Sequence, residues 1–178
     1  MKSIDLERLN RKNFKAMMNA LSMPGNMEKI EELYNSNLLA IANTLLYSEI
    51  SFFYEGKEDI SIIEAITNTQ KEIIENADYI FSDVLDNDLV TRAKKGDFIN
   101  PDFSGTLIFT CKDVEKIKTV LSGPGIDGTK EVYLPCDKSF IEELMGKNSE
   151  YPLGVEVFFV MDSGEILALS RTTKVEVI

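Results

Sequence analysis

The sequence predicts an α/β protein in which a mixed β-sheet is flanked by helices. Two observations lead to this prediction. Segments with helical spacing of apolar residues alternate with short apolar segments typical of strands, and the region 152–178 has the pattern of an antiparallel hairpin followed by one more strand. Strands separated by helices usually pair in parallel, whereas a hairpin adds antiparallel strands, so the sheet should contain both.

The hairpin is the strongest local signal. Residues 155–161 are apolar except for Glu156, and residues 166–169 are apolar throughout, so both faces of both strands need cover. The Asp-Ser-Gly segment 162–164 separates them, and its glycine can adopt the positive φ that a short hairpin loop requires. Because full burial of a large apolar side chain contributes about 1.5–3 kcal/mol, this hairpin should anchor the core.

Helices are predicted at four places. The first spans residues 6–21 and stops before Pro24, because a residue that precedes proline disfavours the helical conformation. The second follows the capping residues 35–37, and its apolar residues surround it on most sides, so it should be central. The other two are a small helix marked by Leu85, Leu89 and Ala93 and ended by Gly96, and a helix capped by Asp137 and ended by Gly146.

The remaining strands are predicted from short apolar or alternating segments. They are residues 50–54, 77–81, 106–111, 114–121, 129–134 and 174–177, and the last of these should have one exposed face. Residues 60–74 have a mixed pattern. Isoleucines at 62, 63 and 66 suit a helical turn, but the Thr-Asn-Thr segment 67–69 does not.

Composition indicates one folded domain, residues 1–178. With 44% apolar residues, the chain can bury a substantial core. No segment approaches the roughly 20 apolar residues that cross a bilayer, and no apolar run follows the first residues, so a cytoplasmic protein without a membrane segment is expected. The net charge of −11 disfavours nucleic acid as a partner.

The absence of histidine removes Ser-His-Asp and Cys-His catalysis and imidazole metal ligands. The sequence therefore identifies no independent catalytic site, and no metal is expected. Cys111 and Cys136 lie in strand-like segments and are predicted to be buried, reduced thiols. Groups of carboxylates could hold Mg²⁺, but in a chain with 30 acidic residues they arise without any function; they are Glu142 with Glu143, and Asp83 with Asp86 and Asp88.

Arg171, Thr172 and Thr173 are candidates for ligand binding. They offer a guanidinium group, hydroxyls and backbone amides, which together can bind phosphate. The alternative is that Arg171 pairs with an internal carboxylate such as that of Glu156. Because an arginine directly after a buried strand needs a partner, this structural interpretation is favoured.

Gly123 and Gly125 begin a Gly-x-Gly-x-x-Gly sequence that ends at Gly128. A dinucleotide site requires a helix to start at these glycines, so that free backbone amides meet the pyrophosphate. Residues 129–134 read as a strand instead. A structural turn is therefore favoured, although both glycines stay candidates for shaping a pocket.

Several stretches of the sequence, taken together and in this order, resemble one known family. They are FKAMMNALSMPG at residues 14–25, LSGPGI at 121–126, PLG at 152–154 and RTT at 171–173. The set resembles PhnH, a subunit family of the bacterial carbon-phosphorus lyase system, and the likeness spans nearly the whole chain. Ser170 stands where the family usually has proline, and residues 55–100 match little of the family pattern.

The resemblance implies a fold similar to that of the pyridoxal-phosphate (PLP)-dependent transferases, but without PLP and its Schiff-base lysine. It also implies a homodimer that assembles with the sister subunits PhnG, PhnI and PhnJ. That complex couples ATP to an alkylphosphonate, which gives a ribose 1-phosphonate 5-triphosphate, and an iron-sulfur radical subunit then cleaves the carbon-phosphorus bond. The family has no agreed catalytic residues to transfer, so a scaffold or ligand-positioning role is expected.

Two other interpretations stay open. The chain could act alone on a small phosphorylated ligand, such as a nucleotide or a phosphonate, as a binder or transferase that uses residues 171–173. It could also be a purely structural dimer, which predicts no response to any ligand.

Overall fold

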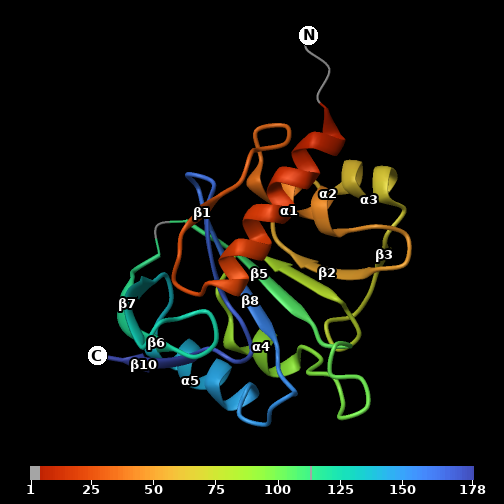
Figure 1. Ribbon diagram of the computed structural model, residues 1–178. Helices are drawn as coiled ribbons and strands as arrows, with labels where there is room; N and C mark the ends of the chain where they lie inside the picture. Colours follow the sequence, from red (N-terminus) through yellow and green to blue (C-terminus); the bar gives the residue numbers. More distant parts are fainter. Residues whose placement is uncertain (1–4, 113) are drawn as a thin grey trace.

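The computed structural model describes residues 5–112 and 114–178. In chain order its elements are α1 (Leu6–Ser22), β1 (Glu28–Lys29), α2 (Asn37–Leu45), β2 (Ser51–Glu55), α3 (Ser61–Thr67), β3 (Gln70–Lys71), β4 (Tyr79–Ser82), α4 (Asn87–Arg92), β5 (Thr106–Cys111), β6 (Ile117–Ser122), β7 (Thr129–Leu134), α5 (Lys138–Lys147), β8 (Glu156–Met161), β9 (Glu165–Leu169) and β10 (Lys174–Val177) (Figure 1).

The main sheet has seven strands in the order β1-β9-β8-β5-β4-β2-β3. Strands β3, β2, β4, β5 and β8 run parallel, whereas β9 is antiparallel to both of its neighbours, β8 and β1. The prediction of an α/β fold with a mixed sheet is therefore confirmed.

Helices cover both faces of this sheet, and each face has its own hydrophobic cluster. Residues of α1, α2 and α3 pack on one face, and residues of α4 and α5 pack on the other. Side chains alternate along each strand, so Ile108 of β5 joins the first cluster while Leu107 and Phe109 join the second. The sheet therefore separates two cores.

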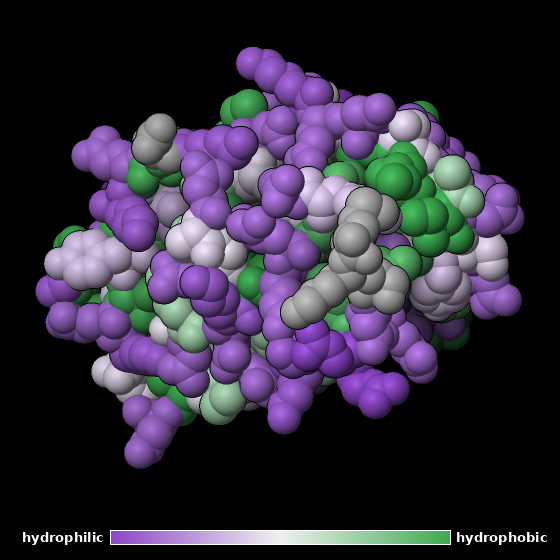
Figure 2. All heavy atoms as spheres, turned by 90° about the horizontal axis from the view of Figure 1, so that it is seen from above, coloured by the Kyte–Doolittle hydropathy of each residue, from purple (hydrophilic) through white to green (hydrophobic). Residues whose placement is uncertain are grey.

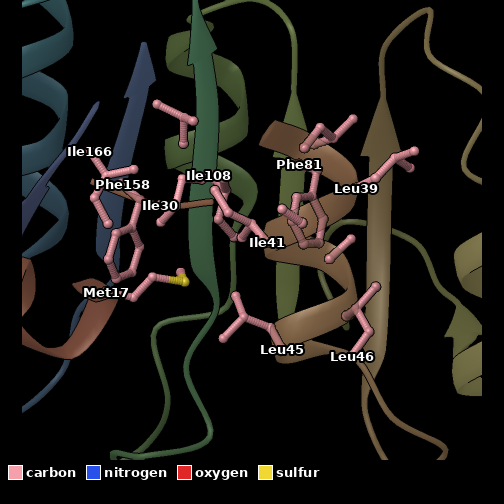
Figure 3. Packing of buried hydrophobic residues seen from close by; sticks show 14 of the residues in the cluster. Met17, Ile30, Leu39, Ile41, Leu45, Leu46, Phe81, Ile108, Phe158 and Ile166 are labelled. Carbon is pink, nitrogen blue, oxygen red and sulfur yellow. The ribbon is translucent and has the colours of Figure 1, made fainter. Parts of the chain in front are cut away.

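Helix α2 is the centre of the first cluster, as predicted. The Ser36 hydroxyl caps it by accepting a hydrogen bond from the Leu39 amide at 3.0 Å. Ile41 and Leu45 reach from the helix toward the strands, where Phe81, Ile108 and other residues complete the packing (Figure 3).

The 155–169 hairpin is confirmed as a buried antiparallel pair, β8 and β9. Gly164 has the positive φ, +79°, that the loop was predicted to need. All the apolar side chains expected to be enclosed are at most 5% exposed: Val157, Phe158, Phe159, Val160, Ile166, Leu167 and Leu169. Residues 106–111 form the parallel neighbour of this hairpin.

A second, antiparallel sheet has the order β10-β6-β7. The sequence predicted these strands but not that they form a separate sheet. Leu121, Leu134 and Val175 from the three strands belong to the second cluster, so this small sheet helps to cover the face that carries α4 and α5. Val175 is buried between the exposed residues Lys174 and Glu176, as predicted for a strand with one exposed face.

Several predicted boundaries are wrong. The small helix α4 ends at Arg92, because the chain turns there into a bridge between Lys95 and Ser104, and Gly96 lies in the following loop. The predicted strand 114–121 begins only at Ile117, whose partner Leu134 precedes Pro135, a residue without an amide hydrogen. Helix α5 continues one residue beyond Gly146, and residues 60–74 form α3 and the short strand β3.

The outer surface is largely hydrophilic in the view from above (Figure 2), which agrees with the high charge of the chain. Within residues 5–112 and 114–178, no helix has both the length and the apolar character needed to cross a membrane.

Candidate functional site

Three of the four stretches that resemble the PhnH pattern meet at one joint, although they are far apart in the sequence. A Cβ atom added to Gly125 would lie 2.0 Å from the Ser22 carbonyl oxygen, and one added to Gly123 would lie 2.8 Å from the Thr172 carbonyl oxygen. Both distances are shorter than any real Cβ contact, so only glycine permits this approach. The loop 123–128 is thus held between the end of α1 and the 170–173 turn, and we call this contact the motif joint.

Arg171, at the edge of the motif joint, is bound by the protein itself. Its Nη1 donates to the carbonyl oxygens of Pro101 (2.6 Å) and Pro152 (3.3 Å), and its Nη2 donates to the Ser104 hydroxyl (2.8 Å). Its Nε lies 3.5 Å from the Glu156 carboxylate, and the two side chains are only 17% and 23% exposed. The favoured interpretation, an ion pair with Glu156, is confirmed.

The two threonines are also engaged locally. Ser170, which directly precedes the Arg-Thr-Thr stretch, has its hydroxyl 3.0 Å from that of Thr172 and 2.9 Å from that of Thr173. The Thr173 amide donates to the Ser170 carbonyl at 2.9 Å, which closes a β-turn, and Thr173 is buried. The two threonine hydroxyls that were candidates for phosphate binding therefore each lie within hydrogen-bond distance of the Ser170 hydroxyl.

Two clefts border the 170–173 turn. One, of about 380 Å³, lies on the side of α5, and its lining includes all three candidate residues, Arg171, Thr172 and Thr173. The other, of about 350 Å³, lies between Pro101, Tyr151 and Arg171. Gly123 and Gly125 line neither cleft, because they face the backbone of the motif joint.

The Gly-x-Gly-x-x-Gly segment is a turn and not a nucleotide loop. The Ile126 amide donates to the Gly123 carbonyl at 3.1 Å, and the chain continues directly into strand β7. No helix begins at these glycines, so the interpretation as a structural turn is confirmed.

A larger crevice, which the sequence did not predict, lies at the carboxyl ends of the parallel strands. Two adjoining hollows of about 830 Å³ and about 610 Å³ share Asp83, Val84 and Lys112. Here the chain leaves β2 toward β3 on one side and leaves β4 toward β5 on the other, and open α/β sheets commonly bind ligands at such a point. Local sequence patterns do not reveal strand order, so they could not locate this crevice.

The charges in the crevice are mixed. Asp83 accepts hydrogen bonds from the Lys57 amide (2.9 Å) and from the Thr110 hydroxyl (3.1 Å). Lys112 lies 4.0 Å from Asp162. These opposite charges largely compensate each other, so the crevice presents no concentrated positive field for a phosphate group.

Metal-ligand clusters and thiols are two kinds of group that can carry chemistry. No cluster of three potential metal ligands occurs in the part of the chain that the structure describes. Cys111 and Cys136 are free and buried, as predicted, and burial raises the pKa of each thiol to about 12. Neither cysteine is therefore a thiolate nucleophile at neutral pH.

Comparison with protein families gives a match to the bacterial phosphonate metabolism protein family PhnH over residues 5–176. A comparison with curated proteins found no match. The family match covers nearly the whole chain, and it includes every residue of the motif joint. The chain therefore belongs to the PhnH family of bacterial phosphonate metabolism proteins.

Proposed function

We propose that this protein is a non-catalytic or ligand-positioning subunit of the carbon-phosphorus lyase core complex. In this role it forms a cytoplasmic homodimer and assembles with PhnG, PhnI and PhnJ, and the complex forms ribose 1-phosphonate 5-triphosphate from ATP and an alkylphosphonate. Family membership supports the role in phosphonate metabolism. The assembly with the sister subunits, the reaction of the complex and the positioning role are the parts that we propose.

The motif joint is the observation that carries a scaffold role. The residues that resemble the family pattern are used for close backbone packing at Gly123 and Gly125 and for internal hydrogen bonds at Arg171. At a catalytic site such groups would be free to contact a substrate. Here Gly123 and Gly125 line neither cleft, and the guanidinium group of Arg171, although it borders both clefts, is bound by protein groups. The joint therefore supports a scaffold subunit, in which the residues of the family pattern hold distant segments of the chain together.

The proposal includes a fold like that of the PLP-dependent transferases that functions without PLP. The likeness requires a mixed sheet with helices on both faces, and the main sheet has this arrangement. Burial lowers the pKa of Lys147, which makes its amine the best suited to Schiff-base chemistry among those with a resolved shift. However, its Nζ donates to the Thr91 carbonyl at 2.7 Å between α4 and α5, and Lys147 lines neither hollow of the crevice.

The alternative of a free-standing binder of phosphorylated ligands has weaker support. It requires the guanidinium group of Arg171 to contact the ligand, yet that group already donates to two carbonyl oxygens and one hydroxyl. A phosphate held through two N–H groups of this guanidinium would displace at least one of these partners.

The test is co-purification of the tagged chain from its native host, grown with a phosphonate as the sole source of phosphorus. Mass spectrometry and sizing should show the sister subunits in one large particle. Recovery of only a homodimer, while the sister subunits are detected in the same cells, would overturn the complex role and favour the free-standing binder.

A further inference from the structure

A projecting loop between α4 and β5 exposes several large apolar side chains. Phe98, Ile99 and Phe103 are 66%, 88% and 64% exposed, and Tyr151 on the neighbouring segment before β8 is 72% exposed. Both segments extend from the lower edge of the molecule (Figure 1). We call residues 97–103 together with Tyr151 the apolar tip.

The apolar tip is held in one conformation by its own backbone contacts. The Asp97 carboxylate accepts hydrogen bonds from the amides of Ile99 (2.8 Å) and Asn100 (2.7 Å), and the Phe103 amide donates to the Asn100 carbonyl at 3.2 Å. Before the loop, Gly96 has a φ of +76°, and a Cβ there would meet the Pro101 carbonyl oxygen at 2.8 Å. The exposed side chains therefore stand on a fixed frame.

Arg171 joins the two parts of the apolar tip. Its Nη1 donates both to Pro101 in the loop and to Pro152, the residue after Tyr151. Pro101, Tyr151 and Arg171 also line the cleft of about 350 Å³ beside the 170–173 turn. The arginine of the Arg-Thr-Thr stretch thus helps to fix the two segments relative to each other, together with the hydrogen bond from the Gly154 amide to the Lys95 carbonyl (3.0 Å).

Such a surface is suited to protein binding. Exposed aromatic side chains contribute most to protein interfaces when they enter a partner's pocket, and a rigid loop loses little conformational entropy on binding. We propose that the apolar tip docks into an apolar hollow, rimmed by lysine and arginine, on another subunit of the phosphonate complex. This inference rests on the proposed function.

The charges around the apolar tip indicate the charge that a complementary partner surface would carry. Of the nearby cations, Lys95 pairs with Glu150 at 2.9 Å, and Arg171 pairs with Glu156. Asp102 is exposed and forms no ion pair with any residue in the described ranges, so the tip presents net negative charge. In a symmetric dimer through this surface the Asp102 carboxylates of the two copies would lie near each other, whereas a basic rim on a different subunit complements them.

The test compares matched variants of the tagged chain, each co-expressed with PhnG, PhnI and PhnJ. The first variant carries Phe98→Ser and Ile99→Ser in the apolar tip. The control carries Ile66→Ser and Tyr133→Ser, which remove apolar side chains that are 48% and 60% exposed on α3 and β7. We expect the tip variant to recover at least tenfold less of the sister subunits than the wild type, while the control recovers as much as the wild type.

Folding is checked by circular dichroism, which should show the same melting temperature for wild type and tip variant. Should the tip variant be unstable, Asp102→Lys provides a second test, because it changes only an exposed charge. We expect this variant to bind the sister subunits more weakly at low salt, and the difference from wild type to diminish at high salt.

The outcomes separate the two proposals. If the wild type recovers no sister subunit, the proposed function fails, and this inference fails with it. If wild type and tip variant recover the sister subunits equally, only the docking surface is wrong. If the tip variant becomes a monomer but still binds the sister subunits, the tip is a dimer interface, and the inference is overturned.

Discussion

Arg171 shows how a single side chain can connect distant segments. Its guanidinium group reaches Pro101 and Ser104 before β5, Pro152 before β8 and Glu156 at the start of β8. Sequence reasoning identified Glu156 as a partner, because a charged residue beside a buried strand requires one. It missed the two carbonyl acceptors, since the positions of loops 100–104 and 150–152 depend on the tertiary fold.

We predict that Arg171→Ala lowers the free energy of unfolding by about 3 kcal/mol, because it leaves Glu156 and two carbonyl oxygens without their donor in a mostly buried place. Urea denaturation measures this change. Arg171→Lys keeps the charge but not the planar fork, so it should restore only part of the loss. An unchanged unfolding midpoint combined with lost phosphonate or nucleotide binding would instead support a ligand site at Arg171.

The side chain of Asp78 connects residues at the amino ends of strands β2 and β4. Its carboxylate accepts hydrogen bonds from the amide (2.8 Å) and hydroxyl (2.7 Å) of Ser51, and it pairs with Lys94. Burial alone would raise the pKa of Asp78, but hydrogen bonds from Lys94 and Ser51 outweigh this effect and lower it.

Because the folded-state pKa of Asp78 lies below its unfolded value, the ionised carboxylate stabilises the protein above pH about 4, and this contribution is lost as pH falls through the folded-state pKa. We predict that Asp78→Asn lowers the free energy of unfolding at pH 7 by about 1 kcal/mol. The difference from wild type should shrink toward pH 3 in urea titrations. Glu142→Gln, at an exposed position, serves as the control, and a difference independent of pH would contradict the prediction.

Among the secondary-structure elements, local patterns predicted most helices and strands but not which strands lie next to one another in the sheets. The β8–β9 hairpin was predicted well, because it is apolar on both faces and its partners are adjacent in the sequence. The separation of β6, β7 and β10 into a second sheet depends on the pairing of Ser122 with Lys174 across the chain, which no local pattern reveals. The sequence identified the stretches that form the motif joint, but it could not show that they contact one another.

The loop between β6 and β7 offers a matched test of the motif joint. Gly125 and Gly128 both have positive φ, but an added Cβ would collide with the Ser22 carbonyl oxygen at Gly125 and would meet nothing within 4 Å at Gly128. We predict that Gly128→Ala costs about 1 kcal/mol of stability from backbone strain alone, and that Gly125→Ala costs about 3 kcal/mol or more. Thermal denaturation compares them, and equal losses would show that the contact with Ser22 is not tight.

At the scale of the whole molecule, the main sheet divides the interior into two hydrophobic clusters. Cys111 and Cys136 belong to the same cluster, with α4 and α5. Their burial therefore makes the two thiols reporters of the integrity of that side of the protein.

We predict that neither thiol of the native protein reacts readily with a disulfide reagent at pH 8, because burial raises both pKa values to about 12. Both should react within minutes in urea. The folded-state pKa lies above the unfolded value of 9.0, so the neutral thiols contribute stability that is lost as pH rises from about 9 toward 12. Rapid reaction of one thiol in the absence of urea would show that its side of the core opens locally.

The position of β9 between β1 and β8 has a consequence for the order in which the molecule is built. Strand β1 follows α1 directly, but its hydrogen-bonding partner is β9. Lys29 of β1 pairs with Glu165 of β9, which lies more than 130 residues later in the chain. Ser22 likewise contacts the loop at Gly125. During synthesis on the ribosome, α1 can pack against α2 early, since the Asn43 side chain donates to that of Asn10 at 2.7 Å. The contacts of α1 and β1 with β9 and with Gly125 can form only after those later segments have been translated, so this side of the core is completed late.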